Sequence, residues 1–386
     1  MTIALGSPPR PVDVLDRVRA MAPDIAARAA EIEAARRVPL DLLENLKAAG
    51  CLRLLLPASH GGAECDLAAA MAAVEELSRA DASVGWVVLI GGGSWLDLTG
   101  LPRATFDSMY QAGRDTITAG AFSPTGVVAP VDGGYLVSGR WSFASGCEHA
   151  DWIYGNCIDT SGGEPNLRIV VFEPHEVEIE DTWTVSGLCG TGSHHFSAQD
   201  VVVPAERTLD VFAHEPCIDS PVVRVPIPAA LALALASVPI GIARGALDDV
   251  VALATDKVPL LSPVTLAANP LFQYQLAEAE VKLRAARSLL YAEAAEIWAV
   301  AVAGEEPTVA LRSRLRAAAV FAATTAAAVV ETAYRAGGGS SLYATSALQR
   351  RLRDVNALNQ HFLLKADTLT TCGALTAGQQ PDVTIF

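Results

Sequence analysis

The sequence has 386 residues, and its content of 51% hydrophobic and 18% charged residues excludes a disordered chain. The formal net charge of −15 argues against nucleic acid as a partner, because an acidic chain repels phosphate backbones. The 7 cysteines include no CxxC pair, which favours a reduced, cytoplasmic setting over an oxidising one. In chain order, the sequence predicts helices, then strands, then helices again.

Residues 1–115 are predicted to form an N-terminal helical domain. Apolar residues recur at helical spacing over 14–49 and 67–79. Glycine clusters at 61–62 and 91–93 predict turns between these helices.

Residues 116–215 are predicted to form a central β domain. Short segments rich in β-branched and aromatic residues alternate with segments rich in glycine, proline and polar residues. The clearest strands lie at 135–139, 152–154, 167–172 and 201–203. This pattern is typical of a small antiparallel barrel or sandwich.

Residues 216–386 are predicted to form a C-terminal helical bundle. The stretch 276–303 is rich in strong helix formers. The uncharged stretch 317–330 predicts a helix buried on every side, against other helices or other subunits. The uncharged stretch 225–243 has about the length of a membrane span. Its prolines and alanines favour a buried helix of the bundle instead, with no membrane involved.

The most informative segment is 139–146, which reads Gly-Arg-Trp-Ser-Phe-Ala-Ser-Gly. If this strand alternates regularly, Trp141, Phe143 and Ser145 share one face. Two rings and a hydroxyl would then be available to a flat aromatic cofactor. An ordinary strand with a buried tryptophan fits the same residues.

A second segment, 183–193, is rich in glycine. Glycines so close together indicate positive φ angles or a close backbone approach. Thr191 and Ser193 place hydroxyl groups beside these glycines. A plain glycine turn between two strands is the alternative interpretation.

The third segment begins at Gly337–Ser341, whose backbone amides could bind a phosphate. In the helix that follows, Arg350 and Asp354 are spaced for an ion pair. Asp354 and His361 are expected on one helical face, two turns apart. A structural role for His361 is an equally good interpretation.

No metal site is predicted. His194 and His195 are adjacent, and no third ligand stands at a usual spacing from them. Cys147 and His149 could form a nucleophile and base, but nothing in the sequence marks an orienting group for them.

Taken together and in this order, the segments resemble the acyl-CoA dehydrogenase superfamily. This resemblance implies an α+β, mostly α fold with an N-terminal helical domain, a central β-barrel or sandwich and a C-terminal four-helix bundle, assembled as a homotetramer. The residues that carry the resemblance are Glu75–Arg79, Ser83–Trp86, Gly133–Tyr135, Trp141–Gly146, Gly187–Ser193, Val203–Pro204 and Gly337–Asp354.

Within the superfamily, the chain is similar to the flavin-dependent monooxygenases, such as phenol hydroxylase large components and dibenzothiophene monooxygenase. The similarity rests on Trp141–Trp152 and on a histidine that follows Asp354. The dehydrogenases carry a catalytic acid at one of two positions, and neither 231–243 nor 369–374 contains an acid. Many of the monooxygenases carry a substrate-binding histidine where this chain has 91–95 without one, which puts a phenolic substrate in doubt.

The resemblance implies that dissociable reduced FMN or FAD arrives from a separate flavin reductase. It would react with O₂ to a C4a-hydroperoxide and then hydroxylate, or oxygenate at nitrogen or sulfur, a small aromatic or heteroatom-bearing substrate. An acyl-CoA dehydrogenase with a relocated base and a non-catalytic flavin-fold binding protein are the alternatives. The catalytic residues implied are Ser145 and His361. The cofactor would contact Trp141, Phe143, Ser145, Trp183, Thr191, Gly192, Ser193, Gly338, Gly339 and Arg353, and the substrate would contact Ser94, Trp95 and Phe122.

Overall fold

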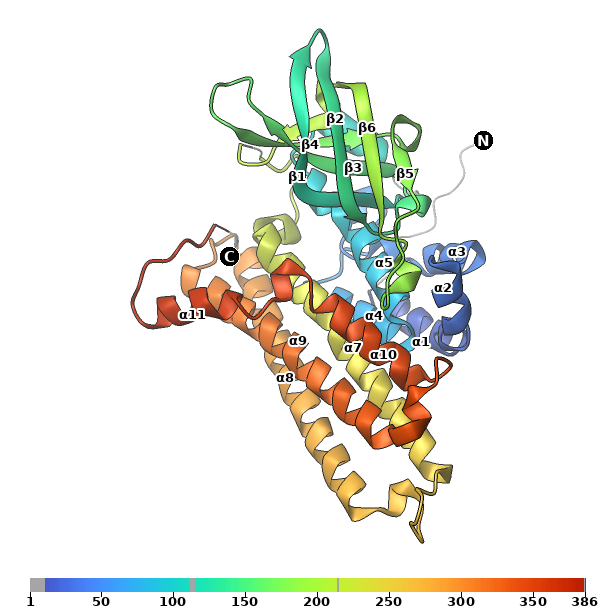
Figure 1. The fold of residues 1–386 in the computed structure, drawn as a ribbon. Helices are drawn as coiled ribbons and strands as arrows, with labels where there is room; N and C mark the ends of the chain where they lie inside the picture. Colours follow the sequence, from blue (N-terminus) through green and yellow to red (C-terminus); the bar gives the residue numbers. More distant parts are fainter. Residues whose placement is uncertain (1–10, 112–114, 214, 385) are drawn as a thin grey trace.

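The computed structural model describes residues 11–111, 115–213, 215–384 and 386. A β-sheet lies at one end of the molecule, and helices from both ends of the chain pack beneath it (Figure 1). The predicted fold class of helices, then strands, then helices is confirmed. The domain limits at 115 and 215 stay a prediction.

Asp66 and Asp81 each begin an N-terminal helix by accepting hydrogen bonds from backbone amides of its first turn. The helical character predicted over 14–49 is confirmed, and the region is divided into three helices, with a turn at Arg36 that has a φ of 55°. The turn predicted at 91–93 is wrong. The helix continues through these glycines, and at Gly92 a Cβ would lie 2.9 Å from the Leu52 backbone, so glycine permits close packing there.

The helices are α1 (Pro11–Ala27), α2 (Ala29–Ala35), α3 (Leu40–Ala49), α4 (Leu67–Ala80), α5 (Ala82–Gly93) and α6 (Arg103–Met109).

The described strands form a seven-stranded sheet in the order β5-β6-β2-β1-β3-β4-β7. All pairs are antiparallel except β1 and β3, which pair in parallel, so the purely antiparallel prediction is wrong at this point. The hairpin joins β1 to β2, and β2 then pairs with β6, which leaves the other edge of β1 open to β3. The strands are β1 (Thr118–Val131), β2 (Gly134–Ala144), β3 (Trp152–Asp159), β4 (Asn166–Phe172), β5 (Glu178–Glu180), β6 (His194–Pro204) and β7 (Thr208–Asp210).

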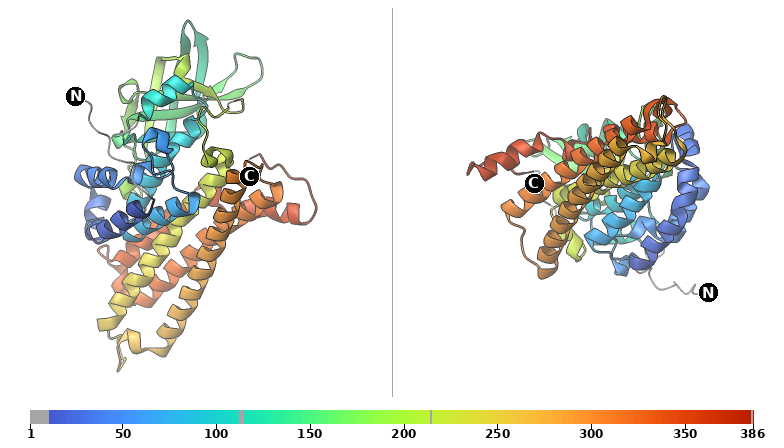
Figure 2. Two further views of the ribbon diagram at one scale, coloured as in Figure 1. Left: turned by 180° about the vertical axis from the view of Figure 1, so that it is seen from behind. Right: turned by 90° about the horizontal axis from the view of Figure 1, so that it is seen from below.

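The long helix α7 lies between α4 and α9. Its Gly241 lets α4 approach, because a Cβ there would lie 2.2 Å from the carbonyl oxygen of Glu75. The far ends of α7, α8 and α9 extend beyond the N-terminal helices (Figure 2). The C-terminal helices are α7 (Ile227–Asp256), α8 (Pro270–Ala303), α9 (Val309–Gly337), α10 (Ala347–Leu358) and α11 (Thr368–Thr376).

Among the described residues, α7 and α9 are long and apolar enough to cross a membrane by length and composition alone. In α7 the most apolar window is 89% buried inside the protein, which confirms the predicted core helix. In α9 the corresponding window is only 50% buried, although its stretch 317–330 carries no charge. The single chain therefore leaves part of an apolar helix uncovered.

Candidate active site

A cavity of about 380 Å³ lies where the N-terminal helices, the sheet and the C-terminal helices meet. Its wall combines residues of α5, of the strands β1 to β3, of the loop before β6 and of the segment after α10. Most of the surface is apolar, with a few polar groups converging on the interior, as is usual for small-molecule sites. The predicted site residues that line it are Ser94, Phe122, Phe143, Ser145, Trp183, Thr191, Ser193 and His361.

A chain of hydrogen bonds runs along one side of this cavity. The Trp86 indole donates to the Ser145 hydroxyl over 2.9 Å. The hydroxyls of Ser145 and Ser193 lie 2.7 Å apart, and those of Ser193 and Thr191 also lie 2.7 Å apart. Thr191 donates to the Leu188 carbonyl over 2.8 Å, which ends the chain.

The two ends of the chain decide its direction. An indole N–H only donates and a carbonyl only accepts. Thr191 gives its proton to Leu188, so Ser193 must donate to Thr191 and Ser145 must donate to Ser193. The Ser145 oxygen accepts from Trp86 and keeps one lone pair for a group in the cavity.

Turns with positive φ place these hydroxyls. Leu188 has a φ of 54°, Gly192 a φ of 51° and Gly146 a φ of 71°. The Gly146 amide donates to the Thr191 carbonyl over 2.8 Å, which ties the end of β2 to the loop before β6. The close backbone approach predicted from the glycines is therefore present, and Gly192 supports the site through its conformation without lining the cavity.

The predicted common face of Trp141, Phe143 and Ser145 is wrong. The β2–β6 register shifts between Trp141 and Ala144, and Phe143 has a φ of 69°. This bulge reverses the alternation of side chains. Phe143 is 66% exposed and meets the Trp183 ring edge to face, with ring centres 6.2 Å apart.

Trp141 instead belongs to the core of the sheet domain. Its side chain is 0% exposed and stacks on Phe196 with ring centres 4.8 Å apart. Its indole donates to the Asn156 carbonyl over 2.8 Å. Trp141 is therefore buried away from the cavity and does not line it, in contrast to the predicted cofactor contact.

His361 reaches the cavity, but not from the helical face expected for it. The helix α10 ends at Leu358, and His361 caps the short 3₁₀ helix Phe362–Leu364. Its Nδ1 accepts the Leu363 amide over 3.3 Å, which leaves the proton on Nε2. Burial, reinforced by the positive charge of Arg316, lowers the pKa of His361 to about 4. His361 is therefore a neutral hydrogen-bond donor near neutral pH.

Asp97 and Tyr154 also line the cavity, and neither is among the predicted site residues. The Tyr154 hydroxyl donates to the Asp97 carboxylate over 2.7 Å. Burial raises the pKa of Asp97 to about 7. The available signal was a lone acid in the otherwise apolar stretch that follows Gly93.

Of the expected substrate contacts, Ser94 and Phe122 line the cavity and Trp95 does not. Trp95 is 1% exposed and packs against Phe106, with ring centres 6.3 Å apart. The 3₁₀ helix Ser94–Leu98 points neighbouring side chains in different directions, so Trp95 enters the core while Asp97 faces the cavity.

Arg353 and Asp354 support the cavity wall from behind. Arg353 is already bound to Glu33 and to the carbonyl oxygen of Ser186, and it does not line the cavity. Asp354 accepts the Leu188 amide over 2.7 Å, and in the described part of the chain no hydrogen bond or ion pair joins it to His361. Among the described residues no hydrogen bond or salt bridge joins Arg350 to Asp354, but the charge of Arg350 opposes the rise in the Asp354 pKa that burial causes, so the predicted pair is present only as a longer-range attraction.

The glycine segment at 337–341 lies far from the cavity within one chain. Lys257, which follows α7, donates to the Ser340 hydroxyl over 2.9 Å. Leu231, in the first turn of α7, lines the cavity. A helix of this length spans roughly 40 Å between these points. Contact of Gly338 and Gly339 with a cofactor held by a neighbouring subunit stays a prediction.

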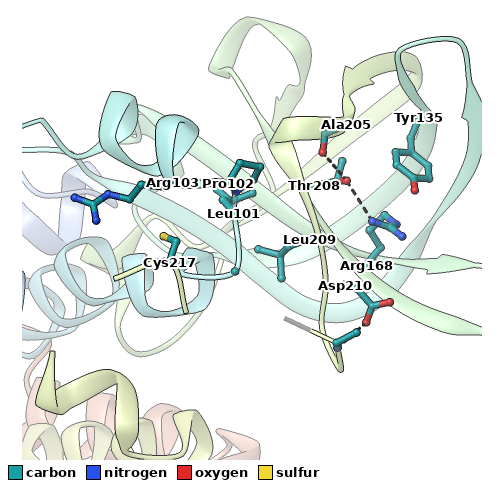
Figure 3. Close-up of a pocket in the computed structure, with 12 residues that line it drawn as sticks. Leu101, Pro102, Arg103, Tyr135, Arg168, Ala205, Thr208, Leu209, Asp210 and Cys217 are labelled. Atoms are coloured by element: carbon teal, nitrogen blue, oxygen red, sulfur yellow. Dashed lines mark hydrogen bonds between the residues drawn. The ribbon is translucent and has the colours of Figure 1, made fainter. Parts of the chain in front are cut away.

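A second hollow lies between α6 and the outer edge of the sheet (Figure 3). Its Arg168 pairs with Asp159 at 3.0 Å, reaches Thr208 and stacks over the Tyr135 ring. Its other cation, Arg103, pairs with Asp107 at 2.6 Å. Because both cations already have partners, this hollow is a weaker site than the cavity at Ser145.

Comparisons with known proteins identify the family of the chain. Residues 12–98 match the family model "Acyl-CoA dehydrogenase, N-terminal domain", and residues 233–366 match "Acyl-CoA dehydrogenase, C-terminal domain". An indole-3-acetate monooxygenase of Pseudomonas putida is 34% identical over 98% of this chain and 96% of its own. The chain belongs to the acyl-CoA dehydrogenase superfamily, in its flavin-dependent monooxygenase branch.

Two further relatives support this assignment. The oxygenase component of an FADH₂-dependent resorcinol hydroxylase from Rhizobium sp. is 30% identical over 96% of this chain and 95% of its own. The crystal structure of the HsaA monooxygenase from Mycobacterium tuberculosis superposes with a TM-score of 0.91 and 28% identity, over 98% of this chain and 100% of that one. The chain is thus the oxygenase component of a two-component monooxygenase, and it uses reduced flavin supplied by a separate reductase.

Proposed function

We propose that the chain oxygenates a small aromatic substrate in the cavity at Ser145. The observation that carries this proposal is the hydrogen-bond chain from Trp86 to Leu188, which leaves one Ser145 lone pair open to the cavity. The relatives named for indole-3-acetate and resorcinol act on aromatic rings, which supports an aromatic substrate. A heteroatom-bearing substrate is the wider class.

The residues present fit a reduced flavin. Phe143 and Trp183 offer exposed aromatic surface to a flat ring at the cavity. Reduced flavin carries a proton on its central ring nitrogen N5, and the open Ser145 lone pair can accept a hydrogen bond from it. When bound, the flavin would supply the two electrons that activate O₂, one atom of which would be transferred to the substrate.

The chain's own residues then have separate tasks. Ser145 orients the cofactor, with its own orientation held by Trp86 and Ser193. His361 donates a hydrogen bond from Nε2 without changing its charge near neutral pH. Apolar side chains of α5 and α7 exclude water, which protects a reactive oxygen species from decay.

Assembly and location belong to the same proposal. The half-covered helix α9 and the exposed Leu342 and Tyr343, each 70% exposed, support a homotetramer in which these surfaces are buried. We further propose a cytoplasmic enzyme with dissociable FMN or FAD and without nucleic-acid or membrane partners. The seven free cysteines support the reducing compartment.

The test is to mix the protein with chemically reduced FMN or FAD and then with oxygenated buffer in a stopped-flow instrument. Flavin reoxidation should be delayed relative to free flavin. Candidate aromatic substrates should then acquire one oxygen-18 atom from labelled O₂. Reoxidation at the rate of free flavin, with both flavins, would refute the proposal.

A further inference from the structure

The charged groups of the cavity are unbalanced. Its described wall residues include one carboxylate, Asp97, and no lysine or arginine. The other ionisable side chains there are Tyr154, whose pKa burial raises well above its usual value, and His361, which is neutral above pH 4 or so. No described wall residue is therefore a cation that could pair with a carboxylate of a substrate; the nearby Arg316 acts on His361 through its charge but does not line the cavity.

Asp97 is held by hydrogen bonding at one of its two oxygens. Oδ2 accepts from Tyr154, while Oδ1 has no hydrogen-bond partner among the described residues. The residue is 5% exposed and belongs to the cavity wall, so a partner for Oδ1 must come from the cavity. Because Oδ1 opens into the cavity, it can accept a hydrogen bond from a ligand there that carries a donor.

Tyr154 fixes the position of this acceptor. Its ring is 1% exposed and packs against the backbone at Gly120, where a Cβ would lie 2.2 Å from a ring carbon. Phe122 meets the same ring edge to face, with ring centres 6.2 Å apart. Asp97 therefore presents its free oxygen beside aromatic surface, where a substrate ring can lie.

We propose that Asp97 selects aromatic substrates that carry an N–H or O–H donor and rejects those that carry a carboxylate. The inference rests on the proposed function, because it concerns the substrate of the same cavity. A donor on the ring satisfies Oδ1, whereas a carboxylate adds a second negative charge to a buried site with no cation in its described wall. Substrates of the neutral indole or phenol type therefore fit, and indole-3-acetate itself does not.

The experiment measures ligand binding to the flavin-free protein by calorimetry at pH 8. The probes are indole, 1-methylindole, which lacks the donor, and indole-3-acetate, which adds a carboxylate. Indole should bind about tenfold more tightly than either analogue. A preference below threefold over either analogue, or no binding of indole, overturns the proposal. Failure of oxygenation would leave these ratios unchanged, so the two proposals fail separately.

Asp97→Asn tests the residue itself, because it removes the charge and keeps the shape. The affinity for indole-3-acetate relative to indole should rise about tenfold in this variant. It should stay unchanged in Asp132→Asn, a matched control at an exposed turn. If Asp97→Asn does not fold, the wild type is titrated from pH 8 to pH 6. The relative affinity for indole-3-acetate should rise as Asp97 takes up a proton, and a constant ratio overturns the proposal.

Discussion

Replacing Ser145 by alanine tests the hydrogen-bond chain on which the proposed function depends. The change removes the acceptor of the Trp86 indole, which is 7% exposed, and the donor to Ser193. It also removes the lone pair that the cavity offers to the cofactor. Both the fold and the oxygenated cofactor should therefore lose stability.

The two losses have different sizes. A buried donor left without a partner costs about 1–3 kcal/mol, so the free energy of unfolding of Ser145→Ala should fall by that amount. One hydrogen bond to the cofactor contributes about 0.5–1.5 kcal/mol, which corresponds to a lifetime of the oxygenated cofactor roughly 2- to 10-fold shorter. Trp86→Phe should shorten the lifetime less, because Ser145 stays but loses its orienting donor.

The assay combines stopped-flow absorbance with the yield of hydrogen peroxide per reduced flavin consumed. Ser108→Ala is the matched control, since Ser108 lies exposed on α6 and, among the described residues, its hydroxyl bonds to the Thr105 carbonyl alone. The control should behave like the wild type. A lifetime and a peroxide yield that are unchanged in Ser145→Ala would refute the reasoning.

Three further predictions follow from the positions of Trp141, His361 and Asp97. Trp141→Phe should lower the free energy of unfolding in urea by about 1–3 kcal/mol, because the Asn156 carbonyl loses its buried donor. The affinity for reduced flavin should not change in this variant. A tenfold change in that affinity would show that Trp141 does contact the cofactor. His361→Ala should lower turnover about 100-fold. The pH profile of wild-type turnover should show no inflection from His361 between pH 5.5 and 8, because the pKa of His361 is lowered to about 4. An inflection in that range that disappears in the variant would contradict the role of His361 as a neutral donor. Burial raises the Asp97 pKa from 3.8 to about 7 in the folded state. The folded protein therefore binds this proton more tightly than the unfolded chain, and the contribution of Asp97 to the free energy of unfolding falls as the pH rises from 3.8 to about 7. In Asp97→Asn, the free energy of unfolding in urea should fall less steeply with pH, by at most about 1.4 kcal/mol per pH unit. An unchanged dependence of this free energy on pH would contradict the burial of the Asp97 charge.

Local chemistry in the sequence was sufficient for the order of the elements. The β-branched segments became β2, β3, β4 and β6, and the alanine-rich stretch 225–243 became the core of α7. These patterns depend on period and composition, which neighbouring residues determine. The motif 139–146 and the glycines before Ser193 likewise located one wall of the cavity before its geometry was known.

The tertiary structure decided what those residues do. The bulge at Phe143 sends Trp141 into the core, and strand periodicity cannot reveal where a register shifts. Ser145 receives its donor from Trp86 in another domain, and Asp97 meets Tyr154 in the same way. Such pairs are brought together only by packing of helices against the sheet. The sequence by itself therefore determined the family and the hydroxyls of the site, whereas only the fold determined the direction of their hydrogen bonds and the acid that faces the substrate.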